Sequence, residues 1–120
     1  MATIAVIDDE AAIRDVLGEI LQTAGHRTLT FSDGAPFLES PDIHQVDMVI
    51  TDYVMPTSGE QVVRALGEKG FPMPVVVMAG HMPNQTACML LAMGAHDVME
   101  KPILITDLLR MVDRWVGVAV

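Results

Sequence analysis

Short apolar runs alternate with amphipathic stretches along the chain, and this alternation limits the possible fold more than any other feature. Runs at residues 3–7, 46–51 and 74–78 are rich in β-branched side chains and end at polar or small residues, which is typical of strands buried on both faces. Weaker runs at 27–31 and 97–99 complete five candidate strands. The sequence therefore predicts an α/β fold, a five-stranded parallel sheet with helices on both faces.

The segments between these runs have apolar residues at helical spacing. From Ala11 onward such residues recur every three or four positions and predict a helix that Gly25 ends, with a buried face of Ile13, Val16, Leu17, Ile20, Leu21 and Ala24. Asp33 is placed to cap a short helix to about Glu39, which Ser40-Pro41 ends. Further helices are predicted at 60–68, 85–93 and 104–116. No linker or repeat is visible, so we expect one domain over residues 1–120.

Composition excludes several classes of function. The formal net charge of −9 argues against a nucleic-acid partner and against an anionic membrane surface, both of which bind basic proteins. No apolar run approaches the roughly 20 residues that a membrane span requires, and Met1 leads directly into a strand-like run without a signal peptide. The single cysteine, Cys88, cannot form an intrachain disulfide. We therefore expect a cytoplasmic protein.

Polar residues follow the predicted strands at their carboxyl ends, where open parallel sheets bind ligands. Asp8 and Asp9 follow the first strand, Asp52 the third, Ala79 closes the fourth, and Lys101 follows the fifth. Converging carboxylates repel one another, and a hard cation such as Mg²⁺ removes that penalty. A carboxylate can also attack phosphorus to form an aspartyl phosphate. Asp52 is the candidate nucleophile, and Lys101 is a second positive centre for the phosphoryl oxygens.

Each of these features also has a structural explanation. Asp8 and Asp9 could cap the next helix, Asp52 could form the turn before Met55-Pro56, and Lys101-Pro102 is a common surface dipeptide. The joint arrangement is more specific than any one part, because every residue follows the appropriate strand.

The motifs that carry this constellation resemble the receiver domain of two-component response regulators. The matching stretches are Val6-Ile7-Asp8-Asp9-Glu10, Ile50-Thr51-Asp52-Tyr53-Val54-Met55-Pro56, Pro74-Val75-Val76-Val77-Met78, and Gly94-Ala95-His96-Asp97 leading to Lys101-Pro102. The resemblance covers essentially the whole chain and implies a flavodoxin-like (βα)5 fold. It implies that Asp52 is the phosphoacceptor, that Asp8 and Asp9 belong to the acidic pocket, and that the backbone carbonyl of Val54 is a further Mg²⁺ ligand. The donor would be a phosphohistidine on a sensor histidine kinase or phosphotransfer protein.

The chain departs from the family pattern at the positions that usually relay the signal. Receivers usually have Ser or Thr at the end of the fourth strand, where this chain has Ala79, and Tyr or Phe in the fifth strand, where it has Val98. The loop after Met55-Pro56 also reaches Gly59 one residue sooner than usual. These changes have three explanations: sequence drift with function kept, phosphorylation with a different relay, or weak or unused phosphorylation.

Two further features concern the rim of the pocket and possible interfaces. Val54 and His81 occupy rim positions that in this family influence the access of water to the aspartyl phosphate; an apolar Val54 should hinder water, whereas His81 is as readily a solvated loop residue. Met82, Cys88, Met89 and Val98 could form an apolar strip on the fourth helix and fifth strand, on a surface through which related receivers meet partners or a second copy. Ordinary helix packing explains this strip equally well.

Four functions compete. The leading one is a phosphoacceptor switch that acts on a downstream protein or output domain and is enzymatic only in catalysing its own phosphorylation and dephosphorylation. The first rival is a protein-interaction module that is not phosphorylated. An aspartyl-nucleophile phosphohydrolase would typically have a second Asp at the position of Val54. A flavodoxin would need a Ser/Thr/Gly-rich phosphate loop where this chain has Asp8-Asp9-Glu10.

Overall fold

The computed structural model describes residues 1–116; the last four residues of the expected 1–120 domain lie outside the described residues. Strands and helices alternate along the chain as the sequence predicted. The strands are β1 (Thr3–Ile7), β2 (Arg27–Phe31), β3 (Met48–Asp52), β4 (Val75–Ala79) and β5 (Asp97–Glu100). The helices are α1 (Ala11–Thr23), α2 (Gly34–Glu39), the 3-10 helix η1 (Pro41–Gln45), α3 (Gly59–Glu68), α4 (Asn84–Ala92) and α5 (Ile105–Val116).

The five strands form one parallel sheet in the order β2-β1-β3-β4-β5. β3 is the central strand, with β1 and β4 on either side, and it is buried along its whole length. From β1 the chain adds β2 on one side and then β3, β4 and β5 on the other, so the strand order reverses between β1 and β3. Sheets with this topology bind ligands in the crevice at such a switch point. The predicted fold class, a flavodoxin-like five-stranded parallel sheet with helices on both faces, is confirmed.

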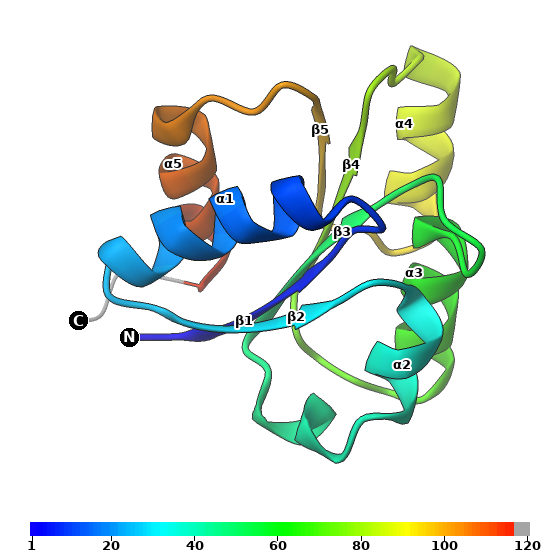
Figure 1. The fold of residues 1–120 in the computed structure, drawn as a ribbon. Coiled ribbons are helices and arrows are strands. Elements are labelled where there is room, and N and C mark those ends of the chain that lie inside the picture. The colour runs from blue at the N-terminus through cyan, green and yellow to red at the C-terminus, as the bar shows by residue number, and fades with distance from the viewer. Residues whose placement is uncertain (117–120) are drawn as a thin grey trace.

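Helices cover both faces of the sheet, with α1 and α5 on one face and α2, α3 and α4 on the other, as Figure 1 shows, and each face has its own apolar core. Alternate strand residues supply the two cores: Ile4 and Ile50 pack beneath α1 and α5, whereas Ile7 and Val49 pack beneath α2 to α4. This alternation is why the strands are apolar at successive positions and do not alternate with polar residues. Of the helices in residues 1–116, none has both the length and the hydropathy to span a bilayer.

The region before β3 differs from the prediction in two ways: a 3-10 helix that was not predicted follows α2, and β3 begins later than expected. Ser40-Pro41 ends α2 but also begins η1, since the Ser40 hydroxyl accepts a hydrogen bond from the Asp42 N–H at 3.2 Å. A proline at the first helical position is favourable because its missing N–H has no partner there. β3 was expected from residue 46 but begins at Met48, because Asp47 instead exchanges hydrogen bonds with Thr3: its carboxylate accepts the Thr3 N–H at 2.8 Å, and its N–H donates to the Thr3 carbonyl at 2.8 Å.

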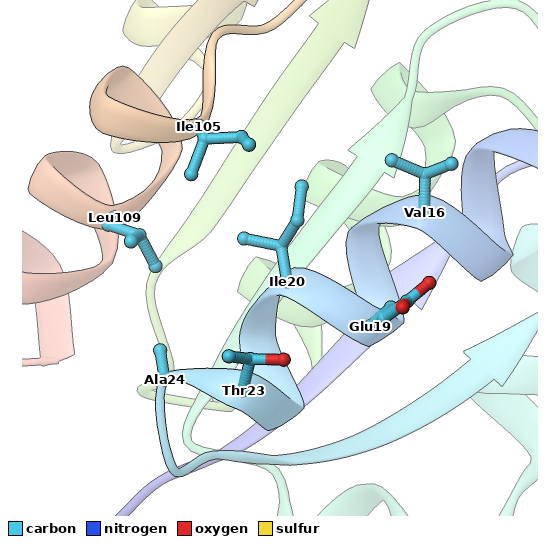
Figure 2. Close-up of a pocket in the computed structure, with 7 residues that line it drawn as sticks. All are labelled: Val16, Glu19, Ile20, Thr23, Ala24, Ile105 and Leu109. Atoms are coloured by element: carbon cyan, nitrogen blue, oxygen red, sulfur yellow. The ribbon is translucent and has the colours of Figure 1, made fainter.

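The predicted buried face of α1 was too wide. Leu17 and Leu21 are buried, but Val16 remains 53% exposed and Ala24 is also exposed. The sheet covers only the central line of this helix, and the outer apolar residues line an open groove of about 490 Å³ between α1 and α5. Figure 2 shows the seven lining residues: Val16, Glu19, Ile20, Thr23, Ala24, Ile105 and Leu109.

Candidate functional site

The carboxyl ends of the central strands bring the predicted site residues to one edge of the sheet. Asp52 is the last residue of β3, Asp8 follows β1 directly, and Lys101 follows β5. The register places Ile7 beside Thr51, so Asp8 and Asp52 emerge next to each other at the switch point. Asp8 is fully buried and Asp52 is 6% exposed, although the surfaces of proteins normally hold such residues.

Lys101 joins the two carboxylates. Its Nζ lies 2.8 Å from Asp8 Oδ2 and 3.2 Å from Asp52 Oδ1. The backbone fixes the base of this side chain, because the Lys101 N–H donates to the Ala79 carbonyl at 2.7 Å. One ammonium therefore bridges the acidic groups of two strands from a third strand, and this pairing satisfies charges that burial would otherwise penalise.

The electrostatics of the site follow from this geometry. Desolvation and the neighbouring Asp8 charge raise the pKa of Asp52, and Lys101 offsets only part of that rise. Desolvation lowers the pKa of Lys101, but hydrogen bonds and charge attraction from Asp8 and Asp52 outweigh it, so the net pKa is raised. Lys101 therefore stays protonated beside Asp52. Any further positive charge near Asp52 would stabilise the ionised form of its carboxylate.

Asp8 is held by contacts beyond Lys101. Its Oδ1 accepts the Glu10 N–H at 2.9 Å, its N–H donates to the Phe31 carbonyl at 3.1 Å, and its own carbonyl accepts from Arg14 Nη1 at 2.6 Å. Arg14 was not among the site residues expected from the sequence. Its position one helical turn into α1 gives no sign that its guanidinium returns to the end of β1.

A group of carboxylates lies beside the Lys101 bridge. Oxygens of Asp8, Asp9 and Glu10 lie within 4.8 Å of one another, with Asp9 and Glu10 exposed. Three carboxylates, two of them on exposed residues, supply hard oxygen donors that suit a divalent cation such as Mg²⁺. The structure thus brings together the predicted Asp8 and Asp9, adds Glu10, which was not predicted as a ligand, and places Asp52 across Lys101 from Asp8.

The rim and relay positions differ in burial. Val54 is 71% exposed, and the His81 side chain is 84% exposed with Nδ1 at 3.9 Å from the Glu100 carboxylate. Ala79 is 2% exposed, and Val98 is partly buried against the core beneath α2 to α4. Both relay positions therefore carry packed aliphatic groups, with no hydroxyl or aromatic ring at either.

The expected apolar strip on α4 and β5 divides into two parts. Met82 and Val98 pack against the core, whereas Cys88 and Met89 remain on the surface. Leu90 is the buried residue of α4.

Lys101 bridges buried Asp52 to Asp8 at the switch point of a sheet in this strand order, an arrangement that agrees with the receiver-type site expected from the sequence. Residues 4–113 match the family model described as the response regulator receiver domain, and the chain belongs to that family. Membership assigns it to two-component phosphorelay signalling, as the sequence predicted.

Several relatives are similar over most of this chain. The tetrathionate response regulatory protein TtrR of Salmonella typhimurium is 30% identical over 120 residues, which are 99% of this chain and 58% of that protein. The transcriptional regulatory protein FixJ of Bradyrhizobium diazoefficiens is 34% identical over 100 residues, which are 82% of this chain and 49% of that protein. The chain thus spans about half the length of these relatives.

Solved structures agree. The FixJ-N crystal structure has a TM-score of 0.86 and 29% identity and covers 100% of this chain and 97% of that one. The Vibrio cholerae chemotaxis protein CheY4 has a TM-score of 0.88 and 27% identity and covers 96% of this chain and 98% of that one. The receiver domain of the Pseudomonas aeruginosa sensor kinase PA1611, which has magnesium coordinated in its active-site cleft, shares the fold with a TM-score of 0.85 at 22% identity, covering 98% of each chain.

Proposed function

We propose that Asp52 accepts a phosphoryl group from a phosphohistidine on a sensor histidine kinase or phosphotransfer protein, and that the chain thereby acts as a signalling switch. The observation that carries this proposal is the Lys101 bridge, at 2.8 Å to Asp8 and 3.2 Å to Asp52. An ordinary structural salt bridge needs only one carboxylate. Here one ammonium pairs with two neighbouring carboxylates at the edge of the sheet where ligands bind, which is typical of a functional site.

The acidic group fits Mg²⁺ by its donor chemistry and its access to solvent. Asp8, Asp9 and Asp52, with the Val54 carbonyl, are the residues that would hold the ion, and Glu10 lies within reach of the same group. When bound, the ion neutralises the charge of the phosphoryl oxygens and the repulsion among the carboxylates.

The residues of the chain divide the chemistry between them. An ionised oxygen of Asp52 forms the new bond to phosphorus, while the bond from phosphorus to the donor imidazole nitrogen breaks and leaves its electron pair on that nitrogen. Lys101 donates to a phosphoryl oxygen as the charge moves onto the Asp52 side of the site. Hydrolysis of the aspartyl phosphate returns the switch to its starting state. The chain therefore catalyses only its own phosphorylation and dephosphorylation.

Mass spectrometry of the intact protein tests this proposal. Incubation with Mg²⁺ and acetyl phosphate or phosphoramidate should add one phosphoryl group, and neither the Asp52→Ala variant nor the protein in EDTA should gain it. Absence of the adduct from wild-type protein under both donors would favour the alternative, a receiver-like interaction module with weak or no phosphorylation.

The relay from Asp52 to a partner is proposed to be atypical. Ala79 and Val98 supply no hydroxyl or ring that could move with the phosphoryl group. The loop between β4 and α4 is instead tied to β5 by the Glu100 carboxylate, which accepts the Met82 N–H at 3.0 Å. Movement of this hydrogen-bonded loop could relay phosphorylation to a partner without the Ser/Thr hydroxyl or the aromatic ring that receivers usually use.

The proposed partners follow from the family and the charge of the chain. They are the phosphodonor, a downstream protein or output domain, and a second copy through the surface formed by α4, β5 and α5. The net charge of −9 disfavours direct contact of this domain with nucleic acid or an anionic membrane, and we propose that it acts in the cytoplasm.

A further inference from the structure

Asp33 makes a contact that its predicted role as a helix cap does not explain. It precedes α2 in extended conformation, and its Oδ2 lies 3.5 Å from the Ala35 N–H, a long distance for a capping hydrogen bond. Its Oδ1 accepts the Thr57 N–H at the much shorter distance of 2.8 Å. Thr57 lies 24 residues further along the chain, in the loop that connects Asp52 to α3. The stronger hydrogen bond of this carboxylate is therefore made to the phosphoacceptor loop.

The loop of residues 53–57 has few other attachments. At its start the Tyr53 N–H donates to the Met78 carbonyl at 2.7 Å, and the Tyr53 carbonyl accepts the Gly59 N–H at 3.0 Å. Met55 is buried in the core, while Val54 before it is 71% exposed. Within residues 1–116, the Asp33 contact is the side-chain hydrogen bond that ties this loop to an element other than its own flanking strand and helix.

The two ends of the loop are closely packed. A Cβ on Gly34 would lie 2.6 Å from Val62 Cγ2 and 3.0 Å from the Thr57 carbonyl. A Cβ on Gly59 would lie 2.7 Å from the Asp52 carbonyl. The start of α2 therefore approaches Thr57 closely, and the start of α3 approaches Asp52 closely, at the two ends of a loop that is one residue shorter than the family pattern.

We infer that Asp33 is a positioning residue of the phosphoacceptor site, whose hydrogen bond to Thr57 fixes the loop that carries the Val54 carbonyl and thereby supports Mg²⁺ binding. This inference rests on the proposed function, in which that carbonyl is a metal ligand. A hydrogen bond to an ionised acceptor is stronger than one between neutral groups, which suits a contact that must restrain a solvent-exposed loop. Outer contacts of this kind orient metal ligands without touching the metal.

Titration of Mg²⁺ by calorimetry, on wild type and four variants, tests this role. Asp33→Ala removes the hydrogen bonds that this carboxylate accepts, and Asp33→Gly removes the contact to Thr57 while keeping a residue that caps helices well. Asp33→Asn removes the charge but keeps an oxygen that can accept from Thr57. Asp47→Ala is the matched control, because Asp47 also accepts a distant backbone N–H at 2.8 Å, from Thr3 at the opposite end of the strands.

We expect Asp33→Ala and Asp33→Gly to weaken Mg²⁺ binding about tenfold, the low end of what loss of an outer-shell partner costs. Asp33→Asn should recover most of the affinity, and Asp47→Ala should bind as wild type does. Hydrogen exchange of residues 53–57 should accelerate in Asp33→Ala and Asp33→Gly but not in Asp47→Ala.

Two results would overturn the inference. One is wild-type Mg²⁺ affinity in both Asp33→Ala and Asp33→Gly. The other is an equal loss in Asp33→Asn without faster hydrogen exchange of residues 53–57, which would show that the charge of Asp33 acts through space and not through the position of the loop. If wild type itself binds no Mg²⁺ and gains no phosphoryl group, the proposed function fails first; if wild type does both and the Asp33 variants match it, only the positioning role fails.

Discussion

The Lys101 ammonium lies 2.8 Å from the carboxylate of Asp8, a fully buried residue 93 positions earlier in the chain. This pair closes the site from two sides, since Lys101 enters from β5 and Asp8 from β1. Removal of Lys101 would leave Asp8 buried and facing Asp52 with no cation between them.

Lys101→Met should therefore destabilise the protein when Mg²⁺ is absent. Breaking a buried ion pair by removal of one partner costs about 3 kcal/mol, and Mg²⁺ should restore part of this loss because it supplies positive charge to the same carboxylates. Urea unfolding with EDTA and with Mg²⁺ measures both effects. The exposed substitution Lys69→Met is the control for loss of one positive charge. Equal stability of Lys101→Met and wild type in EDTA would contradict this account.

Asp9 and Glu10 are both exposed members of the carboxylate group, and their neutral variants should differ in metal binding. We expect Asp9→Asn to abolish most Mg²⁺-dependent stabilisation, which for a ligand at one hundred times its Kd is about 2.7 kcal/mol. Glu10→Gln should retain most of this stabilisation. Glu10 contacts the site through its backbone N–H, which donates to Asp8 Oδ1 at 2.9 Å and is unchanged by the substitution. Thermal unfolding across a Mg²⁺ series measures the difference. A greater loss in Glu10→Gln would assign the ligand to Glu10 instead.

Val54 should slow the loss of the phosphoryl group. The residue is 71% exposed, two positions after Asp52. At this rim position of the family an apolar group should hinder an attacking water, whereas a polar group can orient one. Val54→Asn is therefore expected to shorten the lifetime of phosphorylated Asp52 several-fold without a change in stability. Decay of the phosphorylated mass after removal of donor measures this lifetime, with His81→Ala as a comparison at the other rim position. An unchanged lifetime in Val54→Asn would disprove the role of Val54.

Ala79 provides the test of the proposed relay. Ala79→Thr places a hydroxyl at the end of β4, at a site that is 2% exposed, so a stability loss of about 1 to 3 kcal/mol from overpacking is expected. The hydroxyl should also couple the β4–α4 loop to the phosphoryl group. Hydrogen exchange of residues 80–93 should then respond to beryllofluoride with Mg²⁺ more strongly in Ala79→Thr than in wild type.

Glu100→Ala is the complementary variant for the relay. It removes the acceptor for the Met82 N–H and should reduce the response of the wild-type loop to beryllofluoride. An unchanged response in Glu100→Ala, together with no gain in Ala79→Thr, would place the relay elsewhere.

The sequence predicted the parts of this molecule that depend on periodicity and on strand ends. Asp8, Asp52 and Lys101 could be placed at one edge before any coordinates, because parallel strands put their carboxyl ends together. Contacts that depend on side-chain reach could not be predicted. Arg14 returns to the Asp8 carbonyl, and Asp33 reaches Thr57, through geometry that no residue spacing encodes.

The exposed apolar residues of α1 illustrate the same limit. Helical periodicity identified Val16 and Ile20 as one face, but the width of the sheet decides how much of that face is covered. The uncovered part became the groove between α1 and α5 (Figure 2).

Asp33 should also give the protein a pH-dependent stability. Partial desolvation raises the pKa of this carboxyl, but hydrogen bonds from Thr57, Gly34 and Ala35 outweigh it, so the net pKa lies below its ordinary value. A depressed folded-state pKa contributes stability above the unfolded-state value of about 3.9 and loses it as the pH falls through the lower, folded-state value. The contribution of this one carboxyl should therefore give wild type a free energy of unfolding higher than that of Asp33→Asn by a constant amount between pH 5 and 7. The difference should shrink below about pH 4. Urea unfolding of both proteins across this pH range measures the difference. The other carboxyls are present in both proteins, so their contributions cancel. A difference that stayed constant or widened on acidification would show that ionised Asp33 does not stabilise the loop.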